Sequence, residues 1–183
     1  MPQFKSKIVV NSEQFEQNRK DMLEVIDQLR TLEQRAVDAS EKRRPVFEKR
    51  GQLTPHERLK RLLDPGMPFL TVGNLAGYLV DNSDPEKSIP GSTIVSGIGF
   101  ISGVRCMVVV DDSGIMAGTL TTAGGYRVRR CEEIALEQKL PFVHLVESAG
   151  GDLINYTVEN FSQGGMLFGN LANGGLVRVG VGD

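Results

Sequence analysis

The sequence predicts an α/β fold in which a glycine-rich loop follows each of two buried strands. Two strand-like runs, TIVSGIGFI and VRCMVVVDD, are joined by Ser102-Gly103, which indicates a hairpin. A helical pattern over about residues 122–139 separates this hairpin from a third strand, FVHLV, that follows Pro141. A second helix is expected over about residues 157–172. The order strand, strand, helix, strand, helix is typical of α/β units.

The composition of these elements indicates how they are buried. Six of the seven residues Val104–Val110 are uncharged and apolar, which predicts a strand that is covered on both faces. The helix over about 122–139 carries four residues along the side that would pack on the sheet: Val128, Cys131, Ala135 and Gln138.

Residues 12–50 are predicted to form one long helix before the sheet. Asn11 with Gln14 resembles a capping box, and Pro45 is expected to kink or end the helix. Two interpretations of its apolar stripe remain open: the helix lies against its own domain, or it packs on a partner subunit. The stripe recurs at steps of three, four or seven positions and consists of Phe15, Met22, Ile26, Leu29, Leu32 and Ala36.

A short helix, HERLKRLL, is predicted next, because Thr54, Pro55 and Glu57 suit an N-cap and the first and third helical positions. It ends at the turn sequence Asp64-Pro65-Gly66, and residues 81–91 are expected to form a polar loop. The chain thus divides into three predicted regions. These are a helical extension over 1–50, a short helix with a connecting loop over 51–91, and a glycine-rich α/β region over 92–183.

The charge balance and the cysteine count argue against several classes of function. The net charge of −2, from 21 basic and 23 acidic residues, gives no basic surface for nucleic acid. No apolar run approaches the roughly 18 residues that span a bilayer, and the N-terminus has no signal-peptide pattern. We therefore expect a cytoplasmic protein with neither nucleic acid nor membrane as a partner. Cys106 and Cys131 are too few for a four-cysteine zinc site, so we expect two reduced, buried thiols and no metal.

Two glycine-rich stretches, residues 111–125 and 147–152, follow predicted strands, and ligands bind at the carboxyl ends of strands in open α/β sheets. In the second stretch, Gly150-Gly151 offers bare backbone N–H groups before a helix, a common way to stabilise an oxyanion. In the first stretch, Ala117-Gly118-Thr119 offers the same arrangement. The alternative interpretation is a plain strand–helix turn, because many such turns contain two glycines.

Few side chains offer other chemistry. Ser148 lies in no nucleophile-elbow motif, and no phosphate-binding loop with lysine is present. His144 is either a core histidine or a base, and His56 is expected at the surface. Glu147 is either a base or an acceptor at a helix start. Three arginines of the following helix face either solvent or the phosphates of a nucleotide-like ligand: Arg127, Arg129 and Arg130.

Three longer stretches occur in the order and at the spacing of a known family. They are RLLDPGMPFLTVGNLAG (61–77), IPGSTIVSGIGFISGVRCMVVVDD (89–112) and GTLTTAGGYRVRRCEEIALEQKLPFVHLVESAGG (118–151). Together they resemble the N-terminal half of the carboxyltransferase (beta) subunit of biotin-dependent acyl-CoA carboxylases. The likeness runs from about residue 12 to about residue 172 and includes the long N-terminal helix.

This resemblance implies a crotonase-like (ClpP/crotonase) α/β fold, a spiral of stacked ββα units that is truncated in this chain. Residues 92–183 would then form a partial carboxyltransferase N-domain. Such subunits move a carboxyl group from carboxybiotin to the α-carbon of an acyl-CoA, and backbone N–H groups stabilise the thioester enolate.

The resemblance also assigns roles to the glycine loops. Gly150 and Gly151 are the expected catalytic N–H donors. The family's loop is typically Ser-Gly-Gly-Ala, so this chain has alanine at its second position and glycine at its fourth. Asp152 either places an anion near the enolate or caps the next helix. The expected substrate contacts are Gly118, Thr119, Ser148 and Ala149.

Biotin, by this resemblance, is carried by a partner, because the chain has no Met-Lys-Met biotinylation motif. The implied partners are acyl-CoA, a biotin carboxylase or biotin carrier subunit, and either further copies of the chain or a C-terminal carboxyltransferase half. Because that second half is not matched, we expect the chain alone not to carboxylate. We also expect the strands 94–110 and 141–146 to expose apolar faces and to promote self-association.

Two other functions remain open. The chain is a non-catalytic acyl-CoA-binding or assembly module, or it is a carboxyltransferase subunit of a biotin-dependent decarboxylase. Decarboxylase subunits of this kind share the fold and the thioester chemistry, so the sequence motifs do not separate them from carboxylases.

Overall fold

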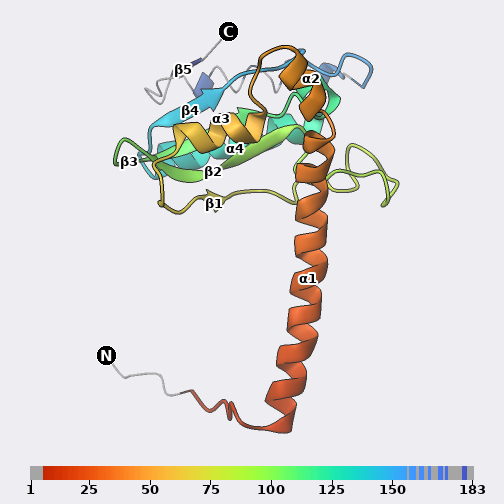
Figure 1. Ribbon diagram of the computed structural model, residues 1–183, viewed down its shortest axis with the longest axis vertical. Coiled ribbons are helices and arrows are strands. Elements are labelled where there is room, and N and C mark those ends of the chain that lie inside the picture. Colours follow the sequence, from red (N-terminus) through yellow and green to blue (C-terminus); the bar gives the residue numbers. More distant parts are fainter. Residues whose placement is uncertain are drawn as a thin grey trace.

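The computed structural model describes residues 6–155, 157–159, 161–162, 165, 169–170, 172 and 179–180. It contains a twisted sheet with helices on both of its faces and one long helix that projects from it (Figure 1). The helices are α1 (Glu13–Glu41), α2 (Arg44–Lys49), α3 (Pro55–Leu62) and α4 (Thr122–Glu137). The strands are β1 (Leu70–Thr71), β2 (Ile94–Ile101), β3 (Val104–Asp111), β4 (Phe142–Leu145) and β5 (Val179–Gly180).

The order of the strands in the sheet brings the two glycine loops together. The sheet has the order β1-β2-β3-β4-β5. β2 and β3 form the predicted antiparallel hairpin, and the pairing runs from Ile94 opposite Asp111 to Ile101 opposite Val104. β4 pairs with β3 in parallel, after the crossover through α4, with Val110 opposite Leu145. Because β3 and β4 run parallel, the loops that follow them start at the same edge of the sheet.

The predicted burial of β3 is confirmed, since α4 covers one face of the sheet and α3 the other (Figure 1). On the α4 side, Met107 and Val109 pack with Val128 and Cys131. On the α3 side, Cys106, Val108 and Val110 pack with Leu59 and Leu145. The expectation that strands 94–110 and 141–146 expose apolar faces is therefore wrong for the central strand. Val104 and Val146, at the ends of these strand regions, are exposed, and further large exposed apolar side chains lie elsewhere, at Met22, Val25, Leu153, Ile154 and Val158 among others.

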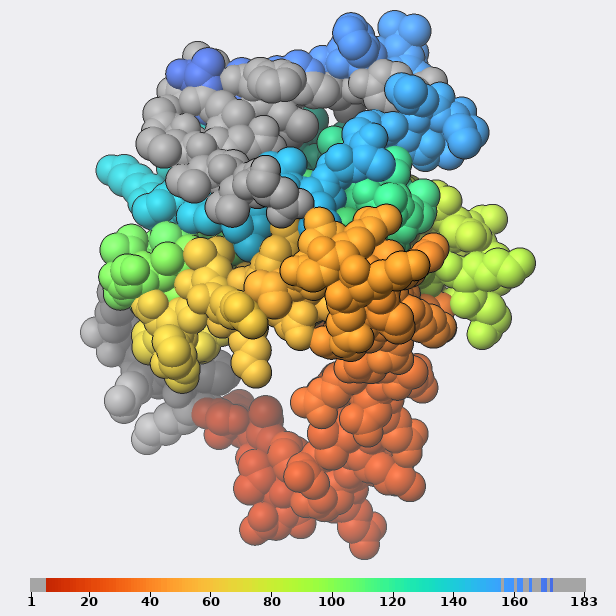
Figure 2. Space-filling model, turned by 45° about the horizontal axis from the view of Figure 1, so that its top comes forward, coloured from red at the N-terminus to blue at the C-terminus, as the bar shows by residue number. Residues whose placement is uncertain are grey.

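The long N-terminal helix is divided, as Pro45 indicated. α1 ends at Glu41, and Pro45 lies in the first turn of α2, where its missing N–H needs no partner. The predicted Asn11–Gln14 capping box is wrong, because Ser12 is the N-cap and its Oγ accepts the N–H of Phe15 at 3.2 Å. The N-terminal part of α1 projects from the sheet (Figure 2), and Met22 is 60% exposed there. Only the end of α1 lies against its own domain.

The connection from α3 to the hairpin follows the sequence signals closely. Thr54 is the predicted N-cap, and it forms a capping box with Glu57 in which each side chain accepts the other's backbone N–H, at 3.2 and 2.9 Å. Asp64, just after α3, accepts the N–H groups of Ser102 and Gly103 at 2.7 Å each and so fixes the hairpin turn. Residues 81–91 contain turns but no helix or strand, as expected.

The bounds of two predicted helices differ from the sequence-based expectation or are only partly described. α4 ends at Glu137, and Gln138 is its exposed C-cap rather than a fourth residue of the packed side. The helix expected over 157–172 falls partly outside the described residues; residues 158–159, 161–162, 165, 169–170 and 172 are helical. β1 was not predicted, because two exposed residues carry no periodic signal.

The capping box of α3 is expected to make the free energy of unfolding vary with pH in the acid range. Hydrogen bonds from Arg44 and from the backbone N–H of Thr54 lower the pKa of Glu57 to about 2. Because the pKa is lower in the folded state, this stabilisation is complete above the unfolded value of about 4.5 and disappears as the pH falls towards about 2. We expect Glu57→Gln to lower the melting temperature at pH 6 and to have a much smaller effect at pH 2, where Glu57 is partly protonated in the folded state.

Thermal melts from pH 2 to pH 6 test this expectation. The control is Glu48→Gln, which changes an exposed carboxylate of α2. Its melting temperature should follow the wild-type curve over the whole range. A Glu57→Gln curve that runs parallel to the wild-type curve from pH 2 to pH 6 would contradict the assigned pKa.

Candidate functional site

The candidate site consists of two loops at the carboxyl edge of β3 and β4. We call residues 112–121 the first glycine loop and residues 147–152 the second glycine loop. Ala149 donates its N–H to the Ala117 carbonyl at 3.1 Å, and Leu120 donates to the Gly150 carbonyl at 2.8 Å. The loops therefore form one unit and not two independent turns. Further bonds between them run from Ser148 Oγ to the Gly118 carbonyl at 2.7 Å and from Asp152 N–H to the Leu120 carbonyl at 3.1 Å.

The first glycine loop holds an unusual backbone conformation at its closest approach to the second. Met116, Ala117 and Gly118 have φ angles of 47°, 53° and 68°, three successive residues in the left-handed region. A Cβ atom at Gly118 would overlap the carbonyl oxygen of Glu147, so the close approach requires glycine. Non-glycine residues adopt this conformation at a cost, and such strain is concentrated at functional sites.

The backbone N–H groups of the two loops are not equally available to a ligand. Gly118 donates to the Ile115 carbonyl at 2.9 Å and Thr119 to the Met116 carbonyl at 3.1 Å. The N–H of Gly150 is bound by Ser148 Oγ at 3.1 Å. Within the described part of the chain, no acceptor is recorded for the N–H of Gly151 or of Ala117. Of the two predicted catalytic donors, Gly150 is thus occupied and Gly151 is available; in the first glycine loop, Gly118 and Thr119 are occupied and Ala117 is available.

Three residues of the second glycine loop serve its internal structure, two through their side chains and one through its backbone. Ser148 uses its hydroxyl to brace both loops, and Ala149 is held by the N–H bond to Ala117. The Asp152 carboxylate accepts from the backbone N–H groups of Ile154 and Asn155 and from the Asn155 side chain at 2.8 Å. The Asn155 side chain contributes most to a lowered pKa of Asp152. Asp152 therefore stabilises a local turn before the helical residues at 158. Whether these residues contact substrate stays a prediction.

Asp111, the last residue of β3, ties the two strands to the second glycine loop. Its Oδ1 lies 2.8 Å from Nε2 of His144 on β4, and its Oδ2 accepts the N–H of Glu147 at 3.0 Å. His144 is 4% exposed, so it is a core histidine with a buried partner and not a base facing substrate. The Glu147 carboxylate pairs with Arg58 of α3 instead of capping a helix.

Asp112, the first residue of the first glycine loop, is also buried. Its Oδ1 accepts from the Ser40 hydroxyl at 2.7 Å and from the N–H of Gly114 at 3.0 Å. Nε2 of His56 lies 3.7 Å from Oδ2. Burial raises the pKa of Asp112 above its ordinary value, and Ser40 and His56 oppose this effect. The expected surface position of His56 is wrong, because its side chain is partly buried beside this carboxylate.

Arg127 has neither of the two predicted environments. It is 6% exposed, and its guanidinium donates to the backbone carbonyls of Val72, Gly91 and Ile94. Burial lowers its pKa to about 10. It is a structural cross-link between α4 and the two ends of the segment that joins β1 to β2. Arg129 and Arg130 are on the helix surface, where both contact Glu133 and Arg129 also lies over the Tyr126 ring.

A cavity of about 310 Å³ lies between residues 72–80 and the first turns of α4, and its lining includes Tyr126 and Arg130. Its walls are otherwise mostly apolar, and neither glycine loop lines it. Among the described residues, no cluster of three or more potential metal ligands is present. In the same part of the chain, no helix is both long and apolar enough to cross a bilayer.

Known proteins share both the sequence and this fold. A family model for the carboxyl transferase domain matches residues 47–176. The chain is 39% identical over 122 residues to a probable biotin-dependent acyl-coenzyme A carboxylase beta2 subunit of Mycobacterium tuberculosis; the match covers 67% of this chain and 22% of the relative. It is 33% identical over 144 residues to the methylcrotonoyl-CoA carboxylase beta chain of Dictyostelium discoideum, covering 78% of this chain and 24% of that one.

Solved structures extend the likeness to the whole fold. The beta subunit of geranyl-CoA carboxylase from P. aeruginosa matches with a TM-score of 0.87 at 43% identity, over 98% of this chain and 34% of that chain. Transcarboxylase 12S matches with a TM-score of 0.72 at 27% identity, over 87% of this chain and 32% of that chain. These matches confirm the predicted crotonase-like α/β fold with its long N-terminal helix. The chain spans roughly a quarter to a third of the length of these proteins. It belongs to the carboxyl transferase domain family, which includes the beta subunits of biotin-dependent acyl-CoA carboxylases.

Proposed function

We propose that the chain binds an acyl-CoA thioester at the two glycine loops and supplies N–H donors to the enolate during carboxyl transfer. One observation carries the proposal. The N–H groups of Gly151 and Ala117 have no recorded acceptor in the described part of the chain, although the loops around them are closely hydrogen-bonded. Both residues are exposed, so their N–H groups are open to a ligand, and the strained backbone beside them is of a kind that is concentrated at functional sites.

The chemistry explains why such donors matter. Loss of the α-proton of a thioester moves negative charge onto its carbonyl oxygen, and fixed N–H groups stabilise that charge without having to reorient. The enolate carbon forms a C–C bond to the carboxyl group as the N–C bond of carboxybiotin breaks, and the released biotin nitrogen ends with the proton that the α-carbon lost. Carboxybiotin is a substrate in this scheme, brought by a biotin carboxylase or biotin carrier subunit. A C-terminal carboxyltransferase half, or another copy of the chain, would complete the active site.

Calorimetry with the full chain tests acyl-CoA binding. The panel is acetyl-, propionyl-, 3-methylcrotonyl- and geranyl-CoA, with free CoA as the ligand that lacks a thioester carbonyl. We expect at least one thioester to bind more tightly than free CoA, because only the thioester has the carbonyl oxygen that is proposed to accept from the loop N–H groups. Equal affinity for free CoA and for every thioester would contradict the proposed site.

One substitution isolates the Gly151 donor. Gly151→Pro removes its N–H, which makes no recorded hydrogen bond, while the adjacent bond from Asp152 N–H to the Leu120 carbonyl remains. We expect thioester affinity to fall about fivefold, the loss of one net hydrogen bond of ~1 kcal/mol. Gly151→Ala, which keeps the N–H, should bind like the wild type. Equal losses in both variants would show that the N–H is not the contact.

A second candidate function is that of a subunit of a biotin-dependent decarboxylase. The observation in its favour is 26% identity over 136 residues to the alpha subunit of glutaconyl-CoA decarboxylase from Acidaminococcus fermentans. The carboxylase relatives are more similar, so carboxyl transfer to an acyl-CoA is the better supported direction. We expect neither activity from the chain alone. Turnover of carboxybiotin with an acyl-CoA by the purified chain would contradict that expectation.

A further inference from the structure

Two side chains from residues 40–58, which run from the end of α1 into α3, contact the two glycine loops, one for each loop. Ser40, in the last turn of α1, donates its hydroxyl hydrogen to Oδ1 of Asp112 at 2.7 Å. Arg58 of α3 forms an ion pair through Nη2 with Oε2 of Glu147. Asp112 is the first residue of the first loop and Glu147 is the first residue of the second. The same segment therefore holds both loops at their starting points.

The contact of Ser40 is built into the packing of the first glycine loop. Ser40 and Asp112 are each 1% exposed, so this hydrogen bond is shielded from water. Oδ1 of Asp112 also accepts from the N–H of Gly114, which places the loop backbone directly against the end of α1. A Cβ atom at Gly114 would lie 2.7 Å from Ser40 Oγ, so the close approach leaves no space for a side chain. Displacement of the end of α1 would thus displace the loop.

The contact of Arg58 fixes the second glycine loop in the same way. Glu147 is held at its backbone, where its N–H donates to Oδ2 of Asp111 at 3.0 Å, and at its carboxylate, which pairs with Arg58. Both charged side chains are about three-quarters buried, with 21% and 26% exposed. The next residue, Ser148, carries the hydroxyl that braces both loops.

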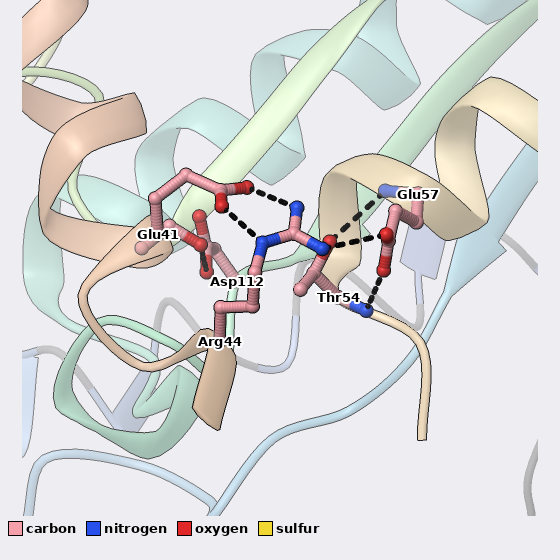
Figure 3. Close-up of polar contacts among 6 residues, drawn as sticks. Glu41, Arg44, Thr54, Glu57 and Asp112 are labelled. Carbon is pink, nitrogen blue, oxygen red and sulfur yellow. Dashed lines mark hydrogen bonds and ion pairs between the residues drawn. The ribbon is translucent and has the colours of Figure 1, made fainter. Parts of the chain in front are cut away.

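The segment between these two contacts is itself cross-linked. Arg44 donates to both carboxylate oxygens of Glu41, at 2.6 and 3.0 Å, and to Oε1 of Glu57 at 2.7 Å (Figure 3). Glu57 in turn closes the capping box with Thr54. The end of α1 and the start of α3 are thus joined through one guanidinium. Ser40 and Arg58 belong to one connected unit and not to two separate elements.

We propose that residues 40–58 form a clamp that sets the positions of the two glycine loops, with Ser40 and Arg58 as its positioning residues. The inference rests on the proposed function only for its effect on acyl-CoA binding. Its effect on loop conformation can be measured without any ligand.

Amide hydrogen exchange under native conditions tests the clamp. We expect Ser40→Ala to speed exchange at Gly114, Ile115 and Gly118 about tenfold, because a buried bond to a carboxylate is lost. The matched control is Ser96→Ala, which removes another fully buried hydroxyl, bound at 2.9 Å to the Val72 carbonyl away from both loops. It should leave the loop amides unchanged. Equal loop exchange in the two variants would overturn the proposal.

A second pair of variants tests Arg58. The core amides measured with them distinguish a local change in the loops from a general loss of stability. Arg58→Met should speed exchange at Ala149 and Gly150, and Arg58→Lys, which keeps the charge, should restore much of the protection. The central strand amides of Met107 and Val109 should exchange as in the wild type in every variant. Acceleration of these amides by the same factor as the loops would mean global opening and would refute a clamp.

Acyl-CoA binding separates the clamp from the proposed function. If the wild-type chain binds a thioester, Ser40→Ala and Arg58→Met should weaken it several-fold, and Ser96→Ala should not. If the wild-type chain binds none, the proposed function fails, while the exchange comparison still decides whether the clamp exists. Faster loop exchange with unchanged thioester affinity in both variants would refute the link between the clamp and the site.

Discussion

Replacing Gly118 with alanine is expected to destabilise the fold by about 3 kcal/mol, more than any other change in the glycine loops. The left-handed conformation of an alanine costs ~1–2 kcal/mol, and forcing a methyl group into packed backbone costs ~1–3 kcal/mol. The methyl group would overlap the Glu147 carbonyl oxygen, so the loops must separate and lose hydrogen bonds that join them. For a chain of this length, the melting temperature should fall by roughly 6–12 °C.

The matched control for this change is Gly125→Ala. Gly125 lies inside α4, and a Cβ atom there would meet no atom within 4 Å. Alanine should stabilise the helix by up to ~1 kcal/mol. Thermal melts of both variants, followed by calorimetry with the thioester that binds best, give the comparison. A Gly118→Ala variant that is as stable as the wild type would show that the loops do not pack as described.

Replacing Arg127 with methionine is expected to cost about 3 kcal/mol, because the carbonyls of Val72, Gly91 and Ile94 would lose their donors in the interior. Burial of the Arg127 charge is unfavourable and lowers its pKa to about 10. Methionine removes this buried charge, which offsets only part of the loss. Urea unfolding should give a lower midpoint with an unchanged slope.

Two further variants sharpen the test of Arg127. Arg127→Lys keeps the charge but not the fork of donors, so its loss of stability should be intermediate. Arg130→Met changes an exposed neighbour on the same helix, 59% exposed at its side chain, and should stay within ~0.5 kcal/mol of the wild type. A larger loss for Arg130→Met than for Arg127→Met would contradict the assigned cross-link.

The sequence predicted those parts of the fold that depend on neighbouring residues. The Ser102-Gly103 hairpin, the apolar run of β3 and the helix start at Thr54 all follow from local chemistry. Contacts between distant residues escaped prediction. Arg127 was expected to face either solvent or the phosphates of a ligand, yet it is buried, and three carbonyls from other segments compensate its burial. Likewise, no local pattern links Ser40 to Asp112.

The candidate site was predictable in position but not in detail. The order of strands placed both glycine loops at one edge of the sheet, which the parallel pairing of β3 and β4 produces. The sequence could not show which N–H groups are free. Ala117 is left-handed although it is not glycine, while Gly118 and Thr119 use their N–H groups within the loop. Those differences depend on backbone angles that the surrounding packing enforces.

The most direct test of the account is an NMR titration of the ¹⁵N-labelled chain with the thioester that binds most tightly in calorimetry. We expect the amide protons of Gly151 and Ala117 to move downfield as they begin to donate to the thioester carbonyl. The amides of Gly118 and Thr119, which already have acceptors in the loop, should move much less. Saturable binding that leaves Gly151 and Ala117 unmoved, and shifts amides away from both glycine loops, would contradict the account.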